Sequence, residues 1–527
     1  MTDDAYILAG LIIVLTVLAG RLVAPLLRLP DAVVLVALGF AVSFLPGMRE
    51  VHISPEVVLL VFLPPLIYNA AFFSSPREMR AEARPIIALA VGATLVTALA
   101  VAAATYYTLP ATGWPAAIAL GAAVAPTDAV AASSVLKRVG APRRVVTVLE
   151  GESLINDGVA LTLFGLAVTA MTTHLTPADG LLELVRVVLG GVAYGLVVAL
   201  VVTRARRRMD DDNVQLVVSL VTPFVAYVPA ELVGFSGVLA AVTAGFYLGT
   251  RGEGILPPRV RVTGRTVWQG LVMLLESVLF VLLGLQLHEV IAHVAGLPPA
   301  ELVTTSLAVI VAAVVVRLLW EVFVPPVMRR LPGGLRLDPG PLPHRLVVGW
   351  SGMRGAISLA IALSLPLTVG GAPFTDRNLL IFLAAVVVLA TLVGQGTTLP
   401  LLLRRLGVTA EDRVRHEIAL AEAAMGRAAL ARIDDLLADE QVDERTAETY
   451  RRVHELRVAH SEALVDTDGR DHGARRDLKD TVFLRHEIIR AQRAALGRLY
   501  RRGGIGHEVF QSLRHELDVQ EPHRPEP

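Results

Sequence analysis

Apolar segments long enough to cross a lipid bilayer follow one another along most of this 527-residue chain. A helix of about 20 apolar residues spans the hydrocarbon core and satisfies its own backbone hydrogen bonds there. The pattern therefore predicts an all-α polytopic membrane protein, and the 54% hydrophobic content excludes an ordinary soluble one. We count about thirteen transmembrane helices, at residues 5–27, 31–47, 55–73, 84–108, 114–137, 145–172, 181–203, 214–233, 236–250, 266–288, 301–327, 345–367 and 377–403.

Basic residues gather in alternate loops between these segments. Loops of one side carry Arg143 and Arg144; Arg204, Arg206, Arg207 and Arg208; Arg251, Arg259, Arg261 and Arg265; and Arg404 and Arg405. The other side offers few, such as Arg49 and Arg377. Because basic loops stay in the cytoplasm, we expect the N-terminus outside the cell membrane and the C-terminus in the cytoplasm. Residues 5–27 follow no basic start, so they read as a first transmembrane helix rather than a signal peptide.

The composition changes abruptly after the last apolar segment. Residues 409–527 are rich in Glu, Arg, Ala and Leu at helical spacing, which is typical of amphipathic soluble helices. We therefore expect a transmembrane domain at 1–405 and a cytoplasmic helical domain at 409–527, with a packing or regulatory role. The chain has no cysteine, which excludes disulfides and thiolate chemistry.

One apolar segment carries four polar residues close together, Glu152, Ser153, Asn156 and Asp157. Since each helical residue advances by about 100°, the four fall within about 140° of one another and share a face. A carboxylate such as Asp157 is costly inside a membrane unless function retains it. Oxygen donors suit a hard cation such as Na⁺ or Li⁺, so this face predicts a monovalent cation site.

The preceding apolar segment contains Pro126, Thr127 and Asp128 in succession. A proline removes a backbone donor and clashes with the preceding turn, so the helix should unwind there. Unwound backbone is tolerated in a membrane where it lines a site, and its free carbonyl groups can coordinate a cation. Asp128 would then neutralise the N-terminus of a half-helix or pair with an arginine.

A lone base, Arg354, lies in a later apolar segment among Gly349, Gly352 and Gly355. Arginine stays protonated when buried, so it can act as a permanent counter-charge. We expect Glu276, another acid in an apolar segment, to be its partner.

Three further charged residues lie in apolar segments. We expect Glu231, which follows a proline, to have a structural or gating role. Arg317 and Glu321 are four residues apart on one helix, which favours an internal ion pair.

These motifs together resemble the monovalent cation:proton antiporter family, which contains the sodium/proton exchangers. The resemblance covers residues 1 to about 405, and its most specific element is Glu-Ser-Leu-Ile-Asn-Asp at 152–157. It implies thirteen helices in two inverted repeats, crossed broken helices, a core domain, a dimerisation domain and a homodimer. The matching segments are Phe62–Leu66, Ala125–Asp128, Glu150–Gly158, Glu276–Gly284 and Gly352–Ala356.

The resemblance also implies an ion site and a reaction. Asp157, Glu152, Ser153 and the Thr127 carbonyl would bind Na⁺, and Asp157 would carry the proton in turn. Asn156 beside Asp157 marks electroneutral one-for-one exchange, whereas an aspartate there marks electrogenic relatives. We expect transported Na⁺ and H⁺, a lipid environment, no cofactor and no nucleic-acid partner.

Two departures and two alternatives stand beside this interpretation. Ala129 replaces a proline of many relatives, so the helix break would be less rigid. Asn69 falls where many relatives carry an acid, so an accessory carboxylate would be missing.

The first alternative function is K⁺/H⁺ exchange by the same mechanism. The second is an intramembrane aspartyl hydrolase, which would pair Asp128 with Asp157 and give Arg354 no role.

Overall fold

The computed structural model describes residues 3–27, 29–45, 48, 57–129, 132–133, 136, 141–172, 177–294, 296, 298–330, 340–408, 411–466, 487–499, 501–502, 509–510, 513–514 and 517. The chain divides into two compact units, Met1–Thr409 and Ala410–Pro527. The described part is helical apart from one short antiparallel pair, β1 (Thr368–Val369) and β2 (Ala372–Pro373).

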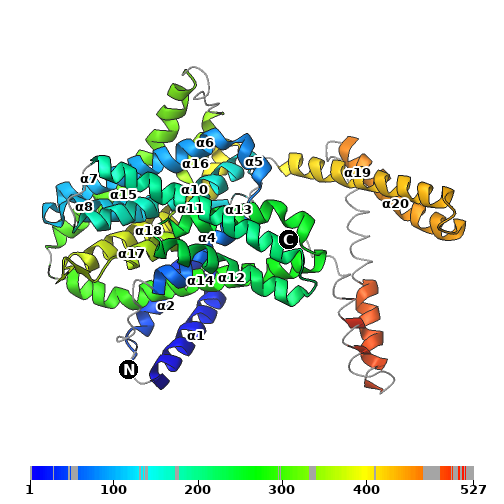
Figure 1. The fold of residues 1–527 in the computed structure, drawn as a ribbon, viewed down its shortest axis with the longest axis horizontal. Helices are drawn as coiled ribbons and strands as arrows, with labels where there is room; N and C mark the ends of the chain where they lie inside the picture. Colours follow the sequence, from blue (N-terminus) through cyan, green and yellow to red (C-terminus); the bar gives the residue numbers. More distant parts are fainter. Residues whose placement is uncertain are drawn as a thin grey trace. The chain divides into compact units, whose positions relative to one another are not determined.

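The first unit is a bundle of closely packed helices (Figure 1). Each expected transmembrane segment contains at least one of them, whereas the number of crossings stays a prediction. They are α1 (Asp3–Leu27), α2 (Asp31–Val42), η2 (Val58–Phe62), α4 (Leu63–Phe72), α5 (Pro76–Ala81), α6 (Ala83–Ile87), η3 (Ala88–Ala93), α7 (Thr94–Thr108), η4 (Pro110–Thr112), α8 (Gly113–Val124), α10 (Arg143–Ala170), α11 (Pro177–Arg206), α12 (Asp212–Leu232), α13 (Gly237–Ile255), α14 (Pro258–Val294), α15 (Pro299–Met328), α16 (Leu342–Trp350), α17 (Ala356–Leu363) and α18 (Arg377–Leu406).

Eight helical stretches of the described residues are long and apolar enough to cross a membrane unaided. They are Ile7–Leu27, Ala83–Thr108, Arg143–Ala170, Val185–Arg206, Asp212–Leu232, Pro258–Val294, Pro299–Met328 and Arg377–Leu406. The molecule is therefore an all-helical, multi-span membrane protein. The other expected segments are shorter or interrupted, and two of these interruptions lie at the site described below.

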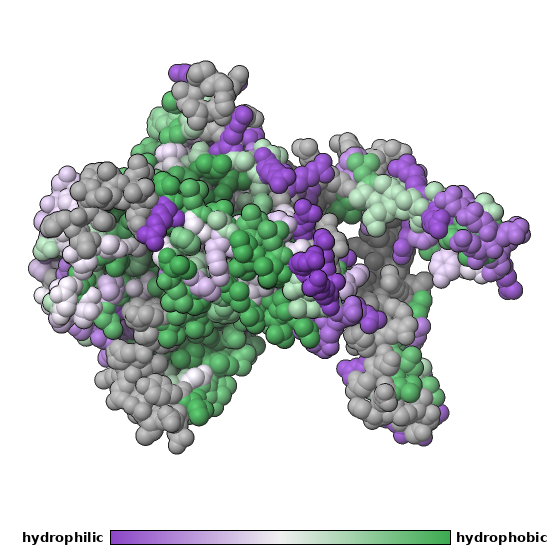
Figure 2. Space-filling view, viewed as in Figure 1, coloured by the Kyte–Doolittle hydropathy of each residue, from purple (hydrophilic) through white to green (hydrophobic). Residues whose placement is uncertain are grey.

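Outward-facing apolar side chains show how this unit meets the lipid. On α1, Leu11, Leu15, Leu18 and Leu22 are all more than half exposed. Figure 2 shows hydrophobic residues over much of the visible surface of the first unit. Lipid is as apolar as leucine, so such a surface needs no protein cover in a membrane.

Small residues let the helices of the bundle approach closely. Gly39 of α2 and Gly284 of α14 face each other so tightly that a Cβ atom at either would overlap the opposite backbone. Close backbone approach of this kind is how helices gain packing energy in a membrane, where no hydrophobic effect drives them together.

In the second unit, α19 (Glu411–Ala438) packs against α20 (Glu444–Asp466) as a hairpin of mainly hydrophilic surface (Figures 1 and 2). Asp443 caps the second helix: the Thr446 hydroxyl and N–H donate to its carboxylate at 2.6 and 3.0 Å. These bonds lower the pKa of Asp443, so this contribution to stability is present at neutral pH and lost as the pH falls through the lowered pKa.

Candidate ion-binding site

Two helices of the first unit are interrupted, and their interruptions meet. The chain is non-helical at residues 125–128, after α8, and at 351–355, between α16 and α17. Pro126 lacks an N–H and cannot continue the helical ladder. The Asp128 N–H donates to the Met353 carbonyl oxygen at 2.7 Å, so each interruption helps to satisfy the other. Non-helical backbone at membrane depth requires such partners.

Arg354 belongs to the second of these interruptions and is fully buried. Its Nε and Nη2 donate to the carbonyl oxygens of Val124 and Ala313, each at 2.9 Å, and its Nη1 donates to that of Gly352. Val124 ends α8, where the helix dipole places negative charge, so a cation is favourable there. The expected ion pair with Glu276 is wrong, because the guanidinium is bound by these neutral carbonyl groups instead.

A buried ion pair joins α10 to α15. Arg317 donates to both carboxylate oxygens of Glu152, with Nη2 2.7 Å from Oε2 and Nη1 bound to Oε1. The two side chains are 3% and 0% exposed, so neither charge is solvated by water. The expected internal pair between Arg317 and Glu321 is wrong: Arg317 bonds across helices rather than along its own.

The same face of α10 holds the interruption at Thr127. The Asn156 Nδ2 donates to the Thr127 hydroxyl at 3.0 Å, and that hydroxyl donates to Glu152 Oε1 at 3.3 Å. The Ser153 hydroxyl donates to the Thr127 carbonyl oxygen at 2.8 Å. The structure thus brings Glu152, Ser153 and Asn156 together around Thr127, as their helical spacing indicates.

Asp157 lies beside this network, on a cavity of about 80 Å³. Its side chain is 4% exposed and accepts no hydrogen bond from the residues that the structure describes. Thr127, Asp128, Ser153 and Glu276 also line the cavity. Glu152 and Asn156 do not line it, because they face Thr127 and Arg317. A buried acceptor without a donor costs free energy, so Asp157 is ready to accept a proton or a cation.

Glu276 lines the cavity from α14, and a basic residue of α1 binds the side chain that follows it on α14. Arg21 of α1 donates to Asp31 at 2.5 Å and to the Ser277 hydroxyl at 3.0 and 3.2 Å. Arg21 therefore acts electrostatically on Glu276, in the place that Arg354 was expected to take.

Glu231 lies away from the cavity. Its Oε1 accepts a hydrogen bond from the Gly237 N–H at 2.9 Å, at the first residue of α13. This bond satisfies a backbone donor that the helix cannot satisfy itself, which is a structural contact.

Sequence reasoning missed four contributors to this site. Arg317 showed the same signal as Arg354, a single base in an apolar segment, but was assigned to its own helix. Ser358 lines the cavity, and Thr391 accepts a hydrogen bond from the Arg354 N–H at 3.2 Å. Arg21 stands near a helix end in the sequence, where arginine is common. Hydroxyl groups in apolar helices give no comparable signal.

A substitution at Gly355 tests how tightly the two helix interruptions are packed against each other. A Cβ atom at this position would overlap the Asp128 carboxylate. We therefore expect Gly355→Ala to destabilise the protein by about 1–3 kcal/mol through overpacking, measured as a lower melting temperature in detergent. Gly394→Ala is the control, because a Cβ atom there meets nothing within 4 Å. Equal melting temperatures for the two variants would contradict this packing.

Comparison with known proteins shows which family this chain is similar to. Residues 11–405 match the family model described as sodium/hydrogen exchanger, transmembrane. An uncharacterised Na⁺/H⁺ exchanger of Mycobacterium tuberculosis is 34% identical, over 97% of this chain and 96% of that protein. A low-affinity Na⁺/H⁺ antiporter of Synechocystis is 31% identical, over 75% and 73%.

Two further proteins bear on cation range and on fold. A sodium, potassium, lithium and rubidium/H⁺ antiporter of Bacillus pumilus is 30% identical, over 74% of this chain and 60% of that protein. The solved structure of a sodium proton antiporter from Methanocaldococcus jannaschii is similar in fold, with a TM-score of 0.63, and covers 76% of this chain and 99% of that one at 19% identity. The chain belongs to the sodium/hydrogen exchanger family of membrane transporters.

Proposed function

We propose that this transporter exchanges Na⁺ for H⁺ across the plasma membrane, and that Asp157 binds the two ions in turn. The observation that carries the proposal is the Asp157 carboxylate itself, buried on a cavity and without a hydrogen-bond donor among the described residues. A proton or a monovalent cation would each neutralise this carboxylate, and one would have to leave before the other could bind.

The groups around Asp157 suit a singly charged ion. Ser153 and Thr127 line the same cavity, and the Ser153 hydroxyl and the Thr127 carbonyl would supply neutral oxygen ligands. No three acidic or histidine side chains of the described residues lie close enough to hold one metal ion, which disfavours a divalent ion. Glu152 would join the ligands only when Arg317 releases it, so we assign it a supporting role in this conformation.

The neutral neighbour of Asp157 supports one-for-one exchange. Asn156 donates to Thr127 and fixes the geometry without adding a titratable group. Asp128 stands beside Gly355 at the N-terminus of α17, where a negative charge is stabilised by the helix dipole. We therefore assign Asp128 a fixed charge, and Asp157 the charge that changes during transport.

The transport cycle would be alternating access in a homodimer. The core containing α8, α10 and α17 would carry the loaded site across a dimerisation domain, as in the thirteen-helix, inverted-repeat architecture. The basic loops support a cytoplasmic C-terminus and an external N-terminus. Each transport cycle would then lower Na⁺ and raise H⁺ inside the cell, in the direction that the gradients of the two ions favour.

A cation panel on purified protein in liposomes with an internal pH dye tests the proposal. We expect Na⁺ and Li⁺ to dissipate a preset pH gradient without any dependence on membrane potential. A response to K⁺ alone would select K⁺/H⁺ exchange. No response to any cation would contradict the proposed function. The hydrolase alternative needs Asp128 and Asp157 to share a hydrogen-bonded proton, and Asp157 accepts no such bond from described residues.

A further inference from the structure

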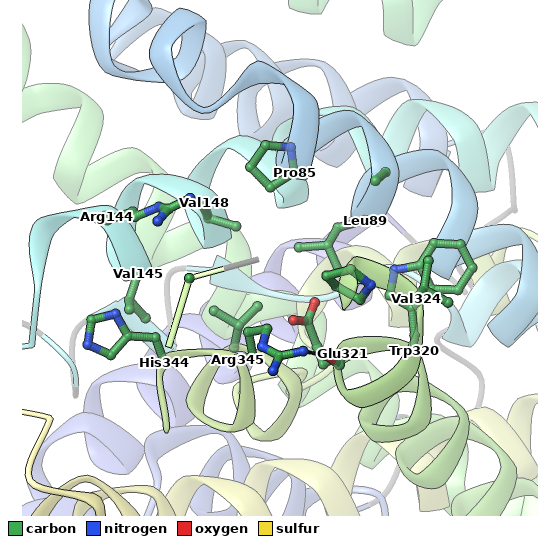
Figure 3. Close-up of a pocket in the computed structure, with 14 residues that line it drawn as sticks. Pro85, Leu89, Arg144, Val145, Val148, Trp320, Glu321, Val324, His344 and Arg345 are labelled. Carbon is green, nitrogen blue, oxygen red and sulfur yellow. Dashed lines mark hydrogen bonds between the residues drawn. The ribbon is translucent and has the colours of Figure 1, made fainter. Parts of the chain in front are cut away.

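A second cavity lies apart from the one that Asp157 lines. It has about 60 Å³ of free volume and shares no lining residue with the first. Its walls are mostly apolar and come from α6, η3, α10, α15 and α16, with Leu89, Val148 and Trp320 among them (Figure 3). Arg144 and His344 lie on one side of it. Arg144 lies at the N-terminus of α10, on the side assigned to the cytoplasm.

A buried carboxyl group turns into this cavity. Glu321 of α15 is 4% exposed, and its Oε1 has no hydrogen-bond partner among the residues that the structure describes. Figure 3 shows its carboxyl group within the lining, close to Arg345 and Leu89. A carboxylate in such a wall costs free energy unless it is protonated or compensated by nearby charges.

The charged groups around Glu321 are bonded elsewhere. Arg345 Nη1 donates to the carbonyl oxygens of Glu321 and Val322, at 3.0 and 3.3 Å, rather than to the carboxylate. Arg144 donates to Glu82 at 3.0 Å. The charged or titratable groups that face Glu321 from the packed helices are Arg317 on α15, Arg345 and His344 on α16, and Arg144 and Glu152 on α10.

Arg317 connects Glu321 to the ion site. It lies one turn before Glu321 on α15 and binds both oxygens of Glu152. Glu152 in turn accepts a hydrogen bond from the Thr127 hydroxyl, and Thr127 lines the Asp157 cavity. A change of charge on Glu321 therefore changes the attraction that Arg317 feels, and with it the electrostatic field at Asp157.

We propose that Glu321 is a second proton-binding group, reached from cytoplasmic water through this cavity, whose charge adjusts cation binding at Asp157 through Arg317 and Glu152. The inference rests on the proposed exchange function. Glu321 is a positioning residue, since it touches no lining group of the Asp157 cavity. The apolar walls keep its field from being screened by solvent.

The direction of the effect follows from the sign of the charge. At alkaline pH the ionised Glu321 adds a negative charge near the site and draws Arg317 away from Glu152, and both changes favour a bound cation. At acidic pH Glu321 is neutral and the additional attraction disappears. Two unit charges about 12–25 Å apart, at an effective dielectric of about 20, change an affinity by about three- to tenfold.

The test is the apparent KM for Na⁺ across the pH range in proteoliposomes. We expect Glu321→Gln to raise KM about three- to tenfold at alkaline pH and to match the wild type at acidic pH. Glu321→Asp keeps a carboxyl group and should keep the pH dependence. Glu301→Gln, at the other end of α15, is the matched control and should follow the wild-type curve.

A second variant tests the same proposal in case Glu321→Gln assembles poorly. Val148→Trp fills the cavity while leaving Glu321 in place, and should remove the same alkaline gain in affinity. Superimposed wild-type and Glu321→Gln curves, or a KM shift of equal size at every pH, would overturn the proposal. A wild type that exchanges no cation would overturn the proposed function together with this inference, so the two failures are distinguishable.

Discussion

Asp157→Asn is expected to reduce cation-dependent proton exchange to the rate of empty liposomes. Asparagine keeps the size of the side chain and removes the only group proposed to bind proton and cation in turn. The variant should assemble normally, with an unchanged or slightly higher melting temperature, because it relieves a buried carboxylate that has no donor among the described residues. Dissipation of a pH gradient by Na⁺, followed with an internal dye, measures the loss.

The control for this variant is Asp210→Asn, an exposed acid in the loop between α11 and α12. It changes the same charge by the same chemistry and should exchange at the wild-type rate. Cation-dependent exchange by Asp157→Asn at more than background would refute a shared site at this carboxylate.

Arg317→Met is expected to destabilise the protein by about 3–5 kcal/mol. The substitution leaves the Glu152 charge fully buried without the two guanidinium bonds that compensate it. The melting temperature of the purified protein in detergent should fall, and expression should fall with it. Methionine fills much of the arginine volume, so the loss reports the missing charge rather than a cavity.

A double-mutant cycle separates this pair from general packing. Glu152→Gln alone leaves Arg317 uncompensated and should also destabilise, whereas Glu152→Gln with Arg317→Met removes both charges and recovers most of the stability. Additive losses in the double variant would show that the two charges do not stabilise each other.

The helix face of α10 could be predicted from the sequence, and so could the interruption after α8. Glu152, Ser153 and Asn156 meet Thr127 because a 100° advance per residue fixes which side chains share a face. Pro126 predicted the interruption because it removes a donor whatever the surroundings. Both inferences depend on local geometry alone.

The partners of the two buried arginines could not be predicted in this way. A spacing of four residues favours a pair on a solvated helix, but Arg317 is buried and binds an acid 165 positions away along the chain. Arg354 is compensated by backbone carbonyls, and carbonyl groups carry no sequence signal. Which helices pack together decides both outcomes, and α8 and α10 are distant in the sequence from α15 and Arg354.

Proton release on cation binding tests the central claim most directly. Purified protein in weakly buffered detergent solution is titrated with Na⁺ near the pH at which Asp157 is half protonated, and the protons released are counted. If Asp157 is the shared site, each Na⁺ should displace a proton where Asp157 is protonated, with release falling at higher pH and absent in Asp157→Asn. Saturable Na⁺ binding that releases no proton even at the pH where Asp157 is half protonated would contradict it.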